Sequence, residues 1–226
     1  MSILFNRLKQ HAFFFYAYLI VLIAGSLLLL LNGKTNSFLL LNEYHLTPID
    51  YFFISYTYLG DGLFALLLVV IFFFILKKRK LAVVLLIAYL STGIIAQIIK
   101  PIVHSLRPET YFFPERMPFF IDEIIHAGDN SFPSGHTVTA FAVAAVLALY
   151  SSNRWHHFLL LLSAVMVGYS RVYLSQHFFL DVLAGSVIGV LGAILCVHFS
   201  RNMNENKLLF GKERTAYKER LTHNPE

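Results

Sequence analysis

The residues of this sequence that could do chemistry lie in three short segments, KPIVHSLRP, NSFPSGHTV and SRVYLSQHFFLD. Arginine can bind phosphate-like oxygens through two parallel hydrogen bonds, and histidine can attack phosphorus or move protons. The three segments therefore predict an oxyanion site that can transfer a phosphoryl group. Its members are three cations, two histidines, one carboxylate and a Ser-Gly pair: Lys100, Arg107, Ser134, Gly135, His136, Arg171, His177 and Asp181.

The Ser-Gly pair stands directly before an apolar run, which predicts that a helix begins there. The free backbone N–H groups and the dipole of a helix N-terminus both favour an anion. Ser134 can cap this helix and also donate to a ligand, and Gly135 lets the backbone approach the ligand closely.

The two histidines suit different chemical roles. His177 and Asp181 are four residues apart, so we expect them on one helix face, with the carboxylate accepting one ring N–H. The other ring nitrogen of His177 is then a candidate nucleophile, and His136 suits a general acid for the leaving oxygen. The sequence has no cluster of carboxylates or cysteines typical of a divalent metal. We therefore expect cations in place of a metal, and no cofactor.

The elements that must position these residues are transmembrane helices. Of the 226 residues 57% are hydrophobic and only 14% are charged, against about 25% charged in soluble domains, and the mean hydropathy is +0.64. A membrane-crossing helix needs about 20 apolar residues. Six stretches approach that length: 12–31, 52–76, 81–99, 136 to about 151, 158 to about 173, and 178–199. We expect an all-α polytopic membrane protein, a bundle of six transmembrane helices in one domain (1–226), with a catalytic core at 100–181 and a tail at 201–226.

Lysines and arginines in the short loops predict the orientation, because such residues favour the cytoplasmic side. They precede the first span, form KKRK at 77–80, separate spans four and five, and fill the tail. Six spans bring all four groups to one side, which places both termini in the cytoplasm. The outer side then holds 32–51, the loop 101–135 between spans three and four, and a turn near 174–176. We expect the site on this outer, periplasmic face of a bacterial inner membrane.

The spacing Lys100-x6-Arg107-Pro108, Pro133-Ser134-Gly135-His136 and Ser170-Arg171-x5-His177-x3-Asp181 resembles the three-part signature of the type 2 phosphatidic acid phosphatase superfamily. The resemblance implies a metal-independent phosphatase with a phosphohistidine intermediate. It implies that His177 is the nucleophile, Asp181 orients it, and His136 is the acid that later activates water. It also implies a phosphate-binding set of Lys100, Arg107, Ser134, Gly135 and Arg171.

The expected partner is a membrane lipid phosphate from the outer leaflet, and no nucleic acid. Undecaprenyl diphosphate is the first choice, and phosphatidic acid, phosphatidylglycerol phosphate and a lipid A phosphate also fit. The oligomeric state stays open. The alternative is a membrane anion-binding protein or transporter without catalysis, which needs cations but no oriented nucleophile.

Several residues have structural explanations that compete with a functional one. Lys100 and Arg171 suit snorkelling residues at helix ends, and His177 with Asp181 suits a structural cap pair. Asp61, in Gly-Asp-Gly within the second span, and His104 are possible substrate-side residues. The two glycines around Asp61 predict an irregular helix.

Two further patterns concern packing and the outer surface. The GxxxG pair at Gly185 and Gly189 predicts close helix packing inside the bundle. The aromatic segment 111–125 predicts either an interfacial wall for a lipid or a cap over the site.

Overall fold

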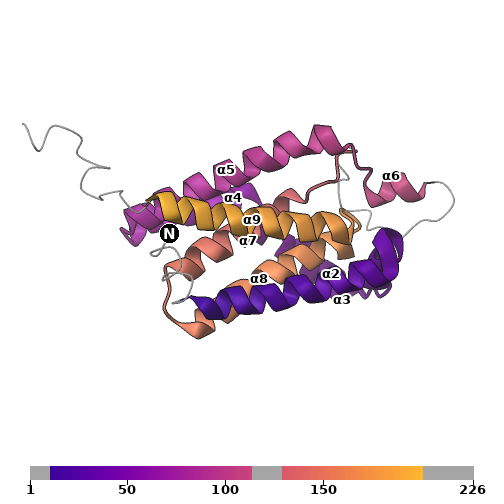
Figure 1. Cartoon of the computed structure of the whole chain (residues 1–226), viewed down its shortest axis with the longest axis horizontal. Coiled ribbons are helices and arrows are strands. Elements are labelled where there is room, and N and C mark those ends of the chain that lie inside the picture. The colour runs from indigo at the N-terminus through magenta and orange to yellow at the C-terminus, as the bar shows by residue number, and fades with distance from the viewer. Residues whose placement is uncertain (1–10, 114–128, 201–226) are drawn as a thin grey trace, which may run out of the picture.

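The computed structural model describes residues 11–113 and 129–200, and every regular element in this part of the chain is a helix. The long helices lie roughly along the longest axis of the molecule (Figure 1). In chain order the elements are α2 (Ala12–Leu41), α3 (Thr47–Tyr56), the 3-10 helix η1 (Thr57–Gly60), α4 (Gly62–Val70), the π-helical turn η2 (Ile71–Ile75), α5 (Arg79–Val103), α6 (Pro108–Phe112), α7 (Gly135–Leu149), α8 (Arg154–Tyr173) and α9 (Phe179–Phe199).

Three of the described helical stretches are long and apolar enough to cross a membrane: Ala12–Leu41, Arg79–Phe112 and Phe179–Phe199. A fourth span arises if Thr47–Gly60 and Gly62–Ile75 cross together despite a bend of 57°. α7 is apolar but shorter. The expected all-α membrane class is therefore confirmed, and the count of six spans stays a prediction.

α7 is the central helix of the bundle. It packs against α9, α8 and α5, and most of its length is buried. Small side chains such as Ala142, Ala145 and Ala148 let the neighbouring helices approach closely. Because the Ser-Gly-His segment opens α7, this packing fixes the segment at one end of the core.

α9 meets α7 through the two glycines of the GxxxG pair. A Cβ atom on Gly185 would lie 2.8 Å from the carbonyl oxygen of Ser134, and one on Gly189 would lie 2.5 Å from the carbonyl oxygen of Val138. A side chain at either position would collide with the α7 backbone. The pair therefore packs inside the bundle, as the sequence predicts.

The first helix runs further than the sequence predicts. The expected span 12–31 continues to Leu41, with a break at Gly33, where φ is +71°. Glycine adopts this left-handed conformation at little cost. Beyond the break, Phe38 is fully buried in a cluster with Phe112 and Phe178. Much of the expected outer connection 32–51 is thus helical.

α5 ends at Val103, beyond the end that the sequence predicts near residue 99. Pro101 lies inside the helix and removes one backbone donor, but so close to the helix end few bonds remain to be lost. His104 ends the helix in the left-handed conformation, and its N–H donates to the carbonyl oxygen of Lys100. The expected outer loop 101–135 therefore begins as the last turn of a helix.

The second apolar run breaks at Gly-Asp-Gly, as its glycines predict. Asp61 lies in the break with extended backbone, between η1 and α4. Its Oδ1 atom accepts the N–H of Leu63 at 2.7 Å and so caps α4. The break turns the chain by 57° and brings η1 against α7 and α8.

The two ends of α7 lie about 22 Å apart, since its 15 residues rise about 1.5 Å each. One end carries the Ser-Gly-His segment. The other borders a cavity that is also lined by Lys78 and Asn153, so the KKRK turn lies at the opposite end of α7 from the site. This separation agrees with the expected orientation, which itself stays a prediction.

Substitution of Gly189 by alanine tests the close contact between α7 and α9. Overpacking of this kind typically costs about 1–3 kcal/mol, so we expect a lower melting temperature in detergent and lower activity. The matched control is Gly93→Ala in α5, where an added Cβ meets no atom within 4 Å and helix propensity improves. Equal melting temperatures of the two variants would contradict the packing role of Gly189.

Candidate active site

Ser134 caps the N-terminus of α7, the central helix. Its Oγ atom accepts the hydroxyl of Thr137 at 2.9 Å and, more weakly, the Thr137 N–H at 3.5 Å. Gly135 has no special backbone conformation, and an added Cβ there would meet no atom within 4 Å. No protein contact therefore requires glycine at this position, and the open space lies beside the first N–H groups of α7.

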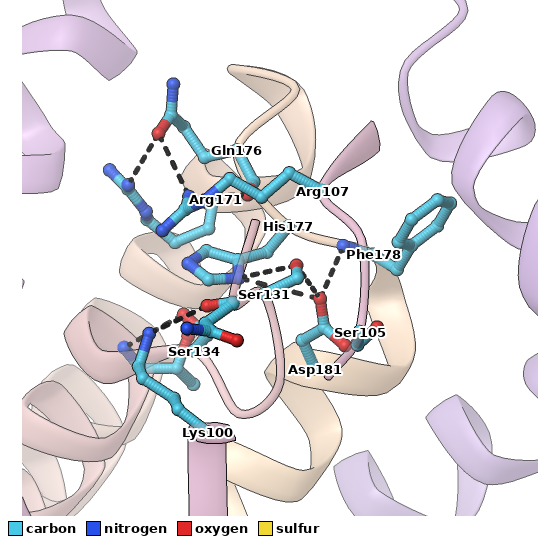
Figure 2. Close-up of polar contacts among 12 residues, drawn as sticks. Lys100, Ser105, Arg107, Ser131, Ser134, Arg171, Gln176, His177, Phe178 and Asp181 are labelled. Atoms are coloured by element: carbon cyan, nitrogen blue, oxygen red, sulfur yellow. Dashed lines mark hydrogen bonds and ion pairs between the residues drawn. The ribbon is translucent and has the colours of Figure 1, made fainter. Parts of the chain in front are cut away.

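α7 and α9 are joined at this end by a backbone hydrogen bond. The N–H of Ser134 donates to the carbonyl oxygen of Asp181 at 3.1 Å. Together with the Gly185 contact, this bond brings the helix N-terminus next to the His177 segment. Figure 2 shows Ser134, His177, Asp181, Lys100 and the two arginines gathered in one region.

His177 is joined to Asp181 through a third residue, Ser131. The Ser131 hydroxyl donates to Asp181 Oδ2 at 2.5 Å and lies 3.2 Å from His177 Nδ1 (Figure 2). The direct distance from Nδ1 to Oδ2 is 3.5 Å, longer than a good hydrogen bond. A serine hydroxyl has one proton, so once it donates to Asp181 it can only accept from Nδ1–H. The relay thus puts the ring proton on Nδ1 and leaves the Nε2 lone pair outside the relay.

The expected helical pairing of His177 with Asp181 is wrong in its local geometry. His177 lies in the connection between α8 and α9, not on α9. Asp181 Oδ2 accepts the N–H of Phe178 at 3.0 Å, so the carboxylate caps the helix and α9 begins after Phe178. The two side chains still meet, because the cap turns the carboxylate back toward the connection.

The turn between α8 and α9 ties His177 to Arg171. The N–H groups of Gln176 and His177 both donate to the carbonyl oxygen of Arg171, at 3.0 and 3.1 Å. Asn42 steadies this turn through bonds from its amide to the carbonyl oxygens of Val172 and Tyr173. A contact between the end of α2 and the end of α8, far apart in the sequence, thus positions the last turn of α8.

Gln176 bridges the two arginines of the site. Its side-chain oxygen accepts from Arg107 Nη1 and from Arg171 Nη2, each at 3.4 Å, and its backbone oxygen accepts from Arg107 Nη1 at 2.9 Å (Figure 2). Arg171 Nη1 also donates to the Thr57 hydroxyl at 2.8 Å. Neutral acceptors therefore hold both guanidinium groups without neutralising them.

Each of these guanidinium groups has a buried Nε–H donor that these bonds do not use. Arg107 Nε and Arg171 Nε are buried, and neither has a hydrogen-bond partner among the described residues. An arginine stays charged at neutral pH. Two charged groups with buried free donors fit the oxygens of an anion.

The remaining signature residues lie in the same surroundings. Lys100 Nζ donates to the carbonyl oxygen of Asn130 at 3.1 Å. The Lys100 side chain also interacts electrostatically with Arg107 and Arg171. His136 is half-buried in the first turn of α7. Its Nε2 atom lies 3.8 Å from Asp61 Oδ2, so the structure brings Asp61 to the site.

His104, the second possible substrate-side residue, is exposed at the end of α5, and its functional role stays a prediction. Most of the aromatic segment 111–125 lies outside the described residues. Sequence reasoning missed Ser131, Gln176 and Thr57 as site residues. Ser131 stands three residues before Ser134, but nothing in its local pattern distinguishes it from an ordinary loop serine.

His177 is neutral in this environment. Its side chain is nearly fully buried, and burial lowers its pKa to about 4, although Asp181 acts in the opposite direction. The positive charges of Arg171 and Arg107 lower the pKa further. A neutral imidazole with a free Nε2 lone pair beside cationic donors has what nucleophilic attack on the phosphorus of a bound phosphate group requires.

The fold and this site define an all-helical membrane protein that gathers two histidines and three cationic side chains at the N-terminal end of its central helix. A profile of the PAP2 superfamily matches residues 81–205, more than half of the chain, and the chain belongs to this family. It is 33% identical over 138 residues to lipid phosphate phosphatase 2 of Arabidopsis thaliana, which covers 50% of this chain and 48% of that protein. It is 32% identical over 105 residues to an undecaprenyl-diphosphatase of Sulfolobus acidocaldarius, with 46% and 48% covered.

The structure is also similar to the crystal structure of Aquifex aeolicus LpxE. The TM-score is 0.62 at 28% identity, over 73% of this chain and 94% of that one. The chain spans about half the length of the curated relatives it matches.

The protonation of His177 can be measured by NMR of protein labelled with 15N at histidine, with His177→Gln to assign the signal. A group whose pKa is lowered to about 4 stays neutral as the pH falls from 7 to 5, whereas solvated histidines titrate near 6.5. We expect a neutral ring with its proton on Nδ1 across this range. Titration of His177 near pH 6.5, or a proton on Nε2, would contradict the relay through Ser131.

Proposed function

We propose that this protein is a membrane lipid phosphatase that hydrolyses a phosphomonoester or diphosphate headgroup through a phosphohistidine on His177. The observation that carries the proposal is the relay from His177 Nδ1 through Ser131 to Asp181. A protein that only binds an anion needs the cations but gains nothing from a buried imidazole with a fixed tautomer.

In the first step the Nε2 lone pair of His177 attacks phosphorus, and the bond from phosphorus to the leaving oxygen breaks. His136 donates a proton to that oxygen. Arg107, Arg171 and Lys100 and the N–H groups at the start of α7 hold the phosphoryl oxygens, which gain negative charge in the transition state. The unused Nε–H donors of the two arginines support this role.

In the second step His136, now neutral, takes a proton from water, and the oxygen of that water attacks phosphorus. The bond from Nε2 to phosphorus breaks and inorganic phosphate leaves. The Nδ1 proton of His177 stays on the ring, hydrogen-bonded to Ser131, throughout both steps. No step requires a metal, because three side-chain cations supply the positive charge.

The substrate is proposed to be a lipid because apolar side chains surround the cationic residues. Ile102, Val103 and Leu106 are exposed in the stretch between Lys100 and Arg107. A hydrocarbon chain can lie against them while its headgroup contacts the cations. Undecaprenyl diphosphate is the first choice, supported by the name of the Sulfolobus relative. Phosphatidic acid, phosphatidylglycerol phosphate and a lipid A phosphate share the same chemistry.

Substituting each histidine in turn tests its role in the two steps of the reaction. The assay uses purified protein in excess chelator, with phosphatidic acid and p-nitrophenyl phosphate as substrates. His177→Ala removes the nucleophile, so no phosphoenzyme forms from either substrate. His136→Ala removes the acid, which typically contributes about 10²–10⁴-fold. Since a nitrophenolate leaves without a proton and a lipid alkoxide does not, this variant keeps phosphoenzyme formation from p-nitrophenyl phosphate alone, and the intermediate accumulates.

The readout is phosphate on the quenched protein that is labile to acid and stable to base. The matched control is His156→Ala, since His156 is exposed and lies at the opposite end of α7. Phosphoenzyme on His177→Ala but not on His136→Ala would reverse the two roles. Activity that appears only when magnesium replaces chelator would refute the metal-free mechanism. Lipid binding without phosphate release would favour an anion-binding protein or transporter.

A further inference from the structure

Asp61 uses only one of its two carboxylate oxygens to cap α4. Oδ1 accepts the N–H of Leu63 at 2.7 Å. Oδ2 lies 3.8 Å from Nε2 of His136, and both side chains are about one-third exposed. Helix capping therefore leaves the position of the second oxygen unexplained.

The helix break is fitted directly against the histidine. A Cβ atom on Gly60 would lie 2.8 Å from the carbonyl oxygen of His136 and 2.5 Å from Val167 Cγ1, so only glycine allows this approach. At the other end of the same 3-10 turn, the Thr57 hydroxyl accepts from Arg171. The η1 turn is thus held at both ends by the site, and the place of Asp61 relative to His136 is set by packing.

The charge of Asp61 is unexpected at this place. The positive groups whose charges act on His136 are Arg171 from α8, His177 when protonated, Arg107 from the outer loop and Lys100 from α5. A free carboxylate beside them weakens the attraction for an anionic substrate. A carboxylate that binds the side of His136 away from the substrate avoids part of that cost and orients the ring.

We propose that Asp61 is a positioning residue for His136: its carboxylate binds Nε2–H and directs Nδ1 toward the substrate. The inference rests on the proposed function, in which His136 is the general acid. Hydrogen bonds in ligand-free sites are often long and tighten in the complex, so the 3.8 Å separation is close enough to form one.

The proton balance of the reaction follows from this arrangement. In the first step the Nδ1 proton of His136 moves to the leaving oxygen as its bond to phosphorus breaks. In the second step Nδ1 takes a proton from the attacking water. Asp61 holds the Nε2 proton through both steps and does not itself become protonated.

Two substitutions separate positioning from capping. Asp61→Asn keeps an acceptor for the Leu63 N–H and removes the charge, whereas Asp61→Ala removes both. Turnover of phosphatidic acid should fall about ten- to hundredfold in both variants, a part of the 10²–10⁴-fold typical of acid–base assistance. Phosphoenzyme formation from p-nitrophenyl phosphate should fall far less. Glu43→Gln, which removes an exposed carboxylate between α2 and α3, should leave both rates unchanged.

The decisive measurement is the double variant. Hydrolysis of the phosphoenzyme needs His136 as the base whichever substrate formed it, so Asp61→Asn alone should slow this step. Because Asp61 acts through His136, adding Asp61→Asn to His136→Ala should change the decay rate of the phosphoenzyme formed from p-nitrophenyl phosphate by less than about twofold. If the losses of the two single variants multiply in the double variant, the inference is overturned. It is also overturned if Asp61→Ala loses activity and Asp61→Asn does not. If the Asn variant melts early, Asp61→Ser repeats the test with a different uncharged cap. An unsubstituted protein that releases no phosphate would refute the proposed function itself, whereas the other two outcomes leave that function standing.

Discussion

The constraint on which the rest of the site depends is that two guanidinium groups, the buried one of Arg171 and the partly buried one of Arg107, have no ion-pair partner in the described part of the chain. Arg107 and Arg171 donate to neutral oxygens of Gln176 and Thr57, and each keeps a buried Nε–H. Buried charges left unpaired are costly, and an oxyanion offsets that cost when it binds. The fold must therefore hold the cations in place before a ligand arrives. The packing of α7 on α9 and the turn folded back on Arg171 serve this purpose.

The parts of the fold that follow from local chemistry could be predicted from the sequence. A serine before a glycine and an apolar run predicts a capped helix start at Ser134, and two glycines around Asp61 predict a broken helix. Glycines four residues apart predict the close contact at Gly185 and Gly189. The first two patterns act through neighbouring residues. The third predicts that the helix has a face small enough for close packing, but not which helix packs there.

The parts of the site that depend on contacts between segments far apart in the sequence could not be predicted. Ser131 stands between His177 and Asp181 because its loop is brought across the start of α9, 46 and 50 residues away in sequence. The spacing of four predicted a shared helix face, but Asp181 caps the helix instead and leaves His177 before it. The approach of Asp61 to His136 likewise depends on the bend between two helices, which a sequence pattern does not measure.

The central claim is that this end of the bundle binds a phosphoryl group with His177 Nε2 in line for attack. The most direct test is a crystal structure of the protein with orthovanadate, which adopts the trigonal-bipyramidal geometry of the transition state. The account predicts vanadium bonded to His177 Nε2, its equatorial oxygens bound by Arg107, Arg171 and the first N–H groups of α7, and its apical oxygen facing His136. Vanadate bound elsewhere, or held by the cations with His177 turned away, would contradict it.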